Sequence, residues 1–165
     1  MKEQFLKDEE YMKLFLMRHA QAQEAKDKTD LLRELTETGK EEAAVAADFL
    51  KHFHIDKILV SAATRTKQTC EIIQDKIKCP KYEILPELYG SSPSTIIGII
   101  SQQDNADKTI LVIAHNPGIF KTALALMDRD SAEYDELLHD GMPTAKIITL
   151  DFPDMKNWGE IKKPS

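Results

Sequence analysis

Two arginines and two histidines follow apolar runs that have the character of buried strands. Arg18 and His19 come directly after KLFLM, Arg65 comes shortly after KILV, and His115 follows TILVIA. The carboxyl ends of parallel strands share one edge of a sheet, where ligands bind, so we expect these four side chains to converge. Guanidinium forks match phosphate oxygens, and helix N-termini at the same edge favour anions. The four residues therefore predict a pocket for a phosphate group.

The elements that would position these residues alternate along the chain. Apolar runs with strand character occur at 13–17, 57–60, 82–85, 109–113 and 145–150. Most are continuous, as expected for strands buried on both faces of a mostly parallel sheet. Amphipathic helical patterns separate them, at 38–53, 63–77, 93–103, 117–127 and 131–139. The alternation predicts right-handed crossovers and an α/β fold, a three-layer sandwich with a mostly parallel central sheet flanked by helices.

Helix start signals and one tail segment give more local expectations. Thr38 with Glu41 predicts a capping box, and Ser92 before a proline predicts an N-cap with proline at the first helical position. Asn116 before its proline predicts the same for the next helix. The tail around Trp158 is expected to add an edge strand.

Composition and charge limit the class of protein. A chain of 165 residues fits one domain, and we expect 13–165 to form it, with 1–12 as an N-terminal extension. The net charge of −6 argues against a general nucleic-acid binder. No apolar run is long enough to cross a membrane, and the charged start lacks the apolar region of a signal peptide. The expected location is therefore the cytoplasm, where the two cysteines would be reduced thiols.

Metal and cofactor chemistry finds no support in the sequence. Cys70 and Cys79 have no zinc spacing, and His52 and His54 lie two residues apart, so they cannot share a helical face as ligands. No dinucleotide, P-loop or nucleophile-elbow motif occurs. We therefore expect neither a metal nor a cofactor.

Each candidate residue has a plainer alternative. A single arginine or histidine at a strand end is usually a solvated or locally satisfied polar group, but four at matching strand ends favour function. Glu87 follows the third strand in LPELYG. A loop carboxylate and a proton donor are both open interpretations for it.

Four motifs in fixed order carry a resemblance to a known family. LMRHA, LTETGKEEA at 35–43, SAATRTKQT at 61–69 and VIAHNPG at 112–118 resemble segments of the histidine phosphatase (phosphoglycerate-mutase-like) superfamily. The resemblance runs from about residue 13 to 151. The short chain and the H-N-P segment look most like the SixA group of phosphohistidine phosphatases. Ala20 stands where the family usually has glycine, and Ala62 replaces a common proline.

The resemblance implies a role for each matched residue. His19 would be the nucleophile that forms a covalent phosphohistidine. Arg18, Arg65 and His115 would bind the phosphoryl oxygens, with Asn116 as a further phosphate-binding residue. Glu87 matches the place where many members carry the proton donor.

The predicted activity is that of a metal-independent phosphatase. Its expected partner is a phosphorylated protein, such as a histidine-containing transfer domain, with small phosphomonoesters as the first alternative. A catalytically silent phospho-ligand binder is a second alternative, but such a binder has no need of a nucleophile. No nucleic-acid or membrane partner is expected.

Overall fold

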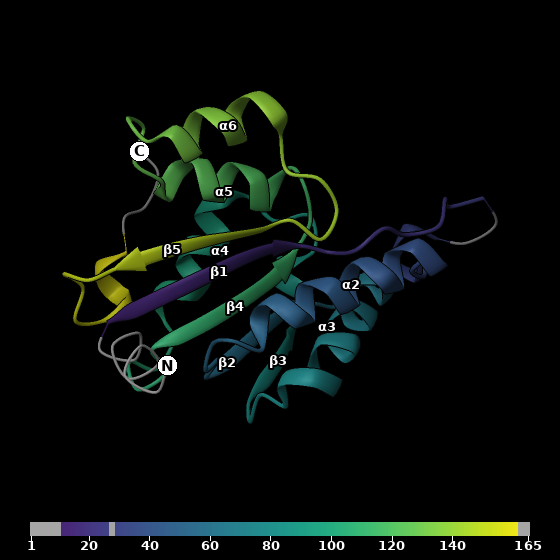
Figure 1. Cartoon of the computed structure of the whole chain (residues 1–165), viewed down its shortest axis with the longest axis horizontal. Helices are drawn as coiled ribbons and strands as arrows, with labels where there is room; N and C mark the ends of the chain where they lie inside the picture. Colours follow the sequence, from purple (N-terminus) through teal and green to yellow (C-terminus); the bar gives the residue numbers. More distant parts are fainter. Residues whose placement is uncertain (1–10, 27–28, 162–165) are drawn as a thin grey trace.

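The computed structural model describes residues 11–26 and 29–161. Five strands form one sheet: β1 (Met12–Arg18), β2 (Lys57–Ser61), β3 (Tyr82–Leu85), β4 (Thr109–Ala114) and β5 (Ile147–Phe152). Their order across the sheet is β3-β2-β4-β1-β5, and β5 alone runs antiparallel to its neighbour (Figure 1). The expected N-terminal extension lies outside the described residues except for its last two.

Helices cover both faces of the sheet (Figure 1). The helices are α2 (Glu37–Leu50), α3 (Thr64–Ile77), α4 (Pro93–Ser101), α5 (Gly118–Leu126) and α6 (Ala132–Asp140). The described residues also form three short 3-10 turns: η1 (Asp30–Leu32), η2 (Pro86–Leu88) and η3 (Trp158–Glu160). Residues of α2 and α3 share one core cluster, and residues of α4, α5 and α6 share another. The predicted three-layer α/β architecture is confirmed.

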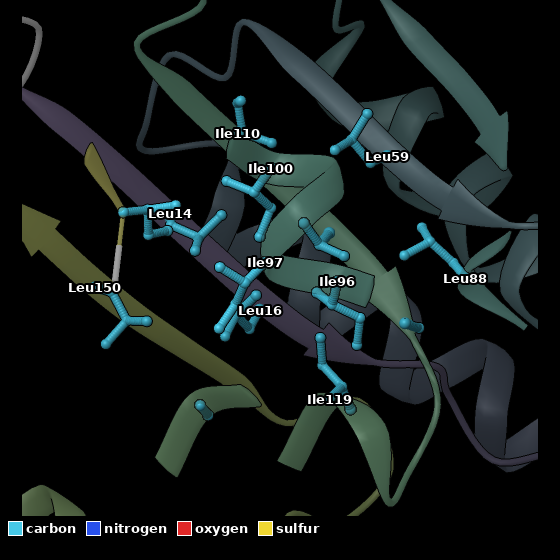
Figure 2. Close-up of a cluster of buried hydrophobic side chains, with 14 of the residues drawn as sticks. Leu14, Leu16, Leu59, Leu88, Ile96, Ile97, Ile100, Ile110, Ile119 and Leu150 are labelled. Atoms are coloured by element: carbon cyan, nitrogen blue, oxygen red, sulfur yellow. The ribbon is translucent and has the colours of Figure 1, made fainter. Parts of the chain in front are cut away.

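The central strand β1 shows how the two cores form. Successive side chains of a strand point to opposite faces. Leu14 and Leu16 pack with the isoleucines of α4, as Figure 2 shows, while Phe15 and Met17 pack on the α2 and α3 side. All four are fully buried, which explains the continuous apolar run. Because β1 is packed on both of its faces, its end is held in place, and the residues that follow it are positioned in turn.

Two of the predicted helix starts are wrong and one is confirmed. Ser92 caps α4 as expected, since its side chain accepts a hydrogen bond from the Thr95 N–H. The cap of α2 is Thr36, whose hydroxyl accepts from the Gly39 N–H, because Thr38 already lies inside the first turn. Asn116 does not cap α5, because the helix begins at Gly118 and Pro117 is the residue that precedes it.

The predicted edge strand around Trp158 is also wrong. The segment forms η3, and the fully buried indole donates a hydrogen bond to the Asp107 carbonyl at 2.8 Å. The large indole is buried in the core cluster that contains the α4 isoleucines. This burial favours a tight turn at Trp158 over an extended strand at the edge of the sheet. None of the helices in the described part of the chain is long and apolar enough to cross a bilayer.

Candidate active site

The ends of β1 and β4 place His19 and His115 side by side. The two strands pair in parallel up to Arg18 and Ala114, and the His19 N–H then donates to the Ala114 carbonyl at 3.1 Å. The two imidazole rings lie with their centroids 5.3 Å apart. Residues nearly a hundred positions apart in the chain thus share one point on the carboxyl edge of the sheet.

Arg65 joins the two histidines. It lies in the first turn of α3, and its side chain is only 6% exposed. Nε donates to His19 Nε2 at 3.3 Å, and Nη2 lies 3.2 Å from His115 Nδ1. The Arg65 guanidinium therefore contacts both imidazole rings, and its positive charge lies between them.

The hydrogen-bond partners decide which nitrogen of each ring carries the proton. His19 Nδ1 lies 2.7 Å from the Ala20 carbonyl, which only accepts, so Nδ1 is protonated and Nε2 keeps a lone pair. His115 Nδ1 faces a guanidinium, which only donates, so the proton is on Nε2. That nitrogen then donates to the Ser61 hydroxyl at 2.7 Å. Both lone pairs point to the arginine between the rings.

Burial and positive charge keep both histidines neutral. The pKa of His19 is lowered to about 4, mainly by burial and then by the charges of Arg65, Arg18 and Arg33. The pKa of His115 is lowered to about 3, again by burial first and then by Arg65. His19 is therefore an unprotonated imidazole at neutral pH, which is the form that can attack an electrophile.

Arg18 lies at the same edge with unused donors. Its Nη1 donates to the Met142 carbonyl at 3.1 Å, and its Nε is buried without a hydrogen-bond partner in the described structure. Its charge contributes to the lowered pKa of both histidines. Burial lowers its own pKa below the ordinary arginine value, yet a guanidinium stays charged in proteins. Arg18 therefore adds a second cation and a free donor to the group.

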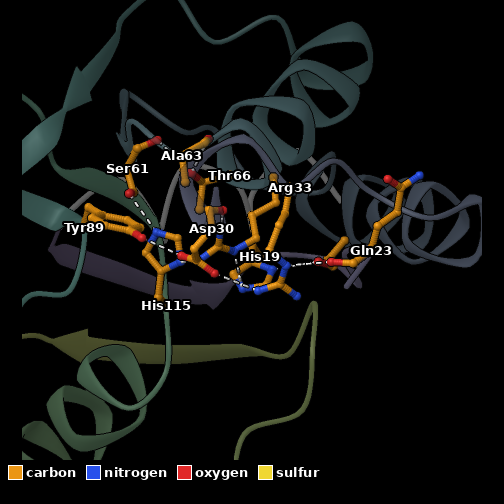
Figure 3. Close-up of polar contacts among 11 residues, drawn as sticks. His19, Gln23, Asp30, Arg33, Ser61, Ala63, Thr66, Tyr89 and His115 are labelled. Atoms are coloured by element: carbon orange, nitrogen blue, oxygen red, sulfur yellow. Dashed lines mark hydrogen bonds and ion pairs between the residues drawn. The ribbon is translucent and has the colours of Figure 1, made fainter. Parts of the chain in front are cut away.

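The structure adds three residues to the site that the sequence analysis did not single out: Asp30, Arg33 and Tyr89. Asp30, in η1, accepts hydrogen bonds from Arg33 Nη1 (2.9 Å), Arg65 Nη2 (3.1 Å) and the Tyr89 hydroxyl (Figure 3). The Tyr89 hydroxyl, with Arg33 and Arg65, holds the pKa of the Asp30 carboxyl well below its usual range. The Tyr89 ring packs edge-on against His115 at 5.4 Å. A loop aspartate between two arginines carries no sequence pattern, apart from its place just before the LTETG motif.

Neither the Glu87 nor the Asn116 side chain forms a hydrogen bond with His19 or His115 in the described part of the chain. Glu87 is exposed in η2 and makes no hydrogen bond or ion pair with any described residue. Asn116 donates from Nδ2 to the Met142 carbonyl at 2.8 Å, the same oxygen that Arg18 uses, and its Oδ1 is buried without a partner. The predicted roles of both residues in proton donation and phosphate binding stay predictions.

Ala20, where the family resemblance leads us to expect glycine, fits just after the end of β1 without backbone strain. Its backbone is not among the positions with positive φ, so the methyl group adds no backbone strain. Its N–H donates to the Thr69 hydroxyl at 3.1 Å, and its carbonyl orients His19. Alanine is therefore accommodated at this position with an ordinary backbone conformation and both backbone groups hydrogen-bonded.

The arrangement suits a tetrahedral anion better than a metal. No group of three or more histidine, cysteine or acidic side chains in the described ranges could hold a metal ion. The buried guanidinium of Arg65 and the partly buried guanidinium of Arg18 instead offer donors beside a neutral imidazole whose Nε2 is unprotonated. Such a site can bind a phosphoryl group and attack it.

Comparison with known proteins agrees with this chemistry. Residues 14–90 match the model of the histidine phosphatase superfamily (branch 1). The phosphohistidine phosphatase SixA of Escherichia coli K12 is 35% identical over 115 residues, which cover 64% of this chain and 68% of that protein. An uncharacterised protein of Mycobacterium tuberculosis is 30% identical over 150 residues, covering 88% of this chain and 92% of its own length.

Solved structures show the same architecture. A SixA-type protein from Nakamurella multipartitia superposes with a TM-score of 0.78 at 28% identity, covering 91% of this chain and 88% of that chain. A protein histidine phosphatase SixA in complex with tungstate gives a TM-score of 0.68 at 28% identity, covering 88% and 92%. Both the sequence and the fold of this chain are similar to those of SixA proteins.

Proposed function

This chain belongs to the histidine phosphatase superfamily and its SixA-like group, and we propose that it removes phosphate from phosphohistidine on a partner protein. The reaction would pass through a covalent phosphohistidine at His19. Relatives named as phosphohistidine phosphatases support this substrate class, and one of them forms a complex with tungstate, a tetrahedral oxyanion.

The contact between His19 Nδ1 and the Ala20 carbonyl is the observation that supports the nucleophile, because it leaves Nε2 as the unprotonated nitrogen, facing Arg65 Nε. The Ala20 carbonyl fixes the proton on Nδ1, and the lowered pKa, about 4, leaves Nε2 unprotonated at neutral pH. The nearest donor is Arg65 Nε, a group that also binds phosphoryl oxygens. The attacking nitrogen, His19 Nε2, therefore lies directly beside a donor that can bind the phosphoryl oxygens, Arg65 Nε.

The proposed chemistry has two displacements. In the first, His19 Nε2 forms a bond to phosphorus while the bond from phosphorus to the substrate imidazole breaks, and that imidazole gains a proton from water. In the second, a water oxygen bonds to phosphorus, the bond to Nε2 breaks, and the water protons pass to phosphate and solvent. Phosphoryl transfer depends mainly on positioning and charge stabilisation, which the two arginines supply without a metal.

His115 assists only when a proton lies between it and the phosphoryl group. Its Nδ1 faces Arg65 with a lone pair, and a lone pair repels a phosphoryl oxygen. A substrate bound as a monoanion brings the needed proton, which can then be shared with Nδ1. The resulting charge-assisted hydrogen bond would stabilise the transition state.

The segment after η2 supports an open site that suits a protein substrate. Only 27 residues separate Glu87 from His115, and α4 and β4 account for most of them. Little chain remains for a lid, and a site without a lid desolvates a small ester poorly but admits a protruding side chain. Phosphohistidine also needs no strong proton donor, because imidazole leaves readily. The exposed, unpartnered Glu87 agrees with that requirement.

A comparison of substrates tests the proposal. The kcat/KM of the full chain would be measured with a phosphorylated histidine-containing transfer domain, with phosphoramidate and with sugar phosphates. We expect the phosphorylated domain to give the highest value. A higher kcat/KM for any sugar phosphate would instead favour the small phosphomonoester alternative. Binding of the phosphorylated domain without turnover would indicate a silent binder.

A further inference from the structure

The carboxylate of Asp30 occupies an anion-binding position next to the reactive histidines. It is held by two guanidiniums and one phenol that come from separate parts of the chain: Arg33, Arg65 and Tyr89. Figure 3 shows Asp30 lying between His115 on one side and Arg33 and His19 on the other. Paired guanidiniums are the usual protein ligands of phosphate, so this aspartate occupies a place built for an anion.

One nitrogen connects the Asp30 contact with the catalytic centre. Arg65 Nη2 lies 3.1 Å from Asp30 Oδ2 and 3.2 Å from His115 Nδ1. A phosphoryl oxygen bound to Arg65 beside His115 would meet the aspartate on the same nitrogen. Two anions on one guanidinium nitrogen repel each other, so the phosphoryl group and the carboxylate compete.

The carboxylate can leave without disturbing Arg65. The Asp30 side chain is 47% exposed, so water can solvate it once it rotates away. Arg65 keeps a second anchor, since its Nη1 donates to the Asp30 backbone carbonyl at 2.8 Å. The acceptor is a backbone oxygen of η1, so this hydrogen bond does not depend on where the Asp30 carboxylate lies. Exchange of the side chain therefore requires a rotamer change rather than local unfolding.

We propose that the phosphoryl group of the substrate displaces the Asp30 carboxylate, and that Arg33 then joins Arg18 and Arg65 as a third arginine on the phosphoryl group. This proposal rests on the proposed phosphatase function and deepens it. Asp30 balances the charge of the empty site, and its return after hydrolysis promotes phosphate release. Arg33 is already near the reaction centre: it binds Asp30 Oδ1 at 2.9 Å and is anchored through Nε to the Gln23 carbonyl at 2.6 Å.

Opposite effects of two substitutions on oxyanion binding test the exchange. The affinity of the full chain for inorganic phosphate and for tungstate would be measured by calorimetry. Asp30→Asn removes the competing charge but keeps the shape, so we expect roughly tenfold tighter binding. Arg33→Gln removes a ligand of the bound anion, so we expect roughly tenfold weaker binding. A purely structural role for this pair would weaken binding in both variants.

Matched controls exclude a general effect of charge. Glu37→Gln removes an exposed acid of α2 that pairs with Lys40, and Arg129→Gln removes an exposed arginine after α5. Neither should change the affinity. Asp30→Ala repeats the test with a second side chain, and circular dichroism and thermal melting check that each variant folds.

Unchanged or weaker binding in Asp30→Asn, or unchanged binding in Arg33→Gln, would overturn the exchange. If the unmodified chain binds both oxyanions but the variants do not separate, only this inference fails. If the unmodified chain binds neither oxyanion, the proposed phosphatase site fails with it.

Discussion

Arg65→Lys separates the geometry of the Arg65 guanidinium from its charge. Arg65 makes four contacts: Nε to His19, Nη2 to His115 and to the Asp30 carboxylate, and Nη1 to the Asp30 carbonyl. A lysine ammonium keeps the positive charge but offers one nitrogen in place of the planar fork. It cannot face both imidazoles and also hold the η1 backbone.

The size of the effect follows from the number of lost donors. Removing one preorganised donor to a transition-state oxygen costs about 10²–10³-fold in turnover. Arg65→Lys loses the second nitrogen of the fork but keeps the charge, so we expect a loss at the lower end, about 10²-fold in kcat. Arg65→Ala also loses the charge and should reach the upper end, about 10³-fold.

Single-turnover kinetics measures this loss most directly. With phosphoramidate as donor, the rate of phosphoenzyme formation should fall in both Arg65 variants, and the alanine variant should be slower. Arg129→Lys, a substitution of an exposed arginine away from the site, should keep the original rate. A rate for Arg65→Lys equal to that of the unmodified chain would refute the requirement for a two-nitrogen fork.

Three further predictions concern pH, packing and proton donation. Because the lowered pKa of His19 is about 4, the nucleophile is unprotonated above that pH. After correction for substrate titration, kcat/KM should hold as the pH falls through 6.5 and drop only near pH 4; a loss centred at 6.5 would contradict the buried, neutral imidazole. Gly39→Ala should lower the free energy of unfolding in urea by about 1–3 kcal/mol, since its Cβ would lie 2.0 Å from the Gln21 carbonyl oxygen; an unchanged urea midpoint would contradict this close approach. Glu87→Gln should leave the hydrolysis of a phosphohistidine protein unchanged, and a large loss there would assign Glu87 a role that its exposure does not show.

The apolar pattern predicted the sheet but not the direction of every strand. The run at 145–150 reads like the others, yet β5 pairs antiparallel with β1, because a buried strand shows the same apolar residues in either direction. Local start signals were also ambiguous. Thr36 and Thr38 are equally good caps by residue type, and the chain geometry that places Thr36 next to the Gln21 carbonyl decides between them.

Strand-end reasoning brought the four candidate residues to one edge but did not find Asp30 and Tyr89, which contact them. Arg65 and His115 lie at strand and helix termini, where topology alone implies proximity. Asp30 and Tyr89 lie in irregular segments, and no periodicity connects them. Their hydrogen bond joins residues 59 positions apart, and only the folded chain shows it.

Trapping the phosphorylated protein tests the central claim, that His19 Nε2 is the nucleophile. The chain would be mixed briefly with labelled phosphoramidate, quenched separately in acid and in base, and mapped by mass spectrometry. We predict one phosphate per chain on His19, stable in base and lost in acid, formed without added metal and absent from His19→Ala. A phosphate that survives acid, that maps to another residue, or that still forms on His19→Ala would contradict it.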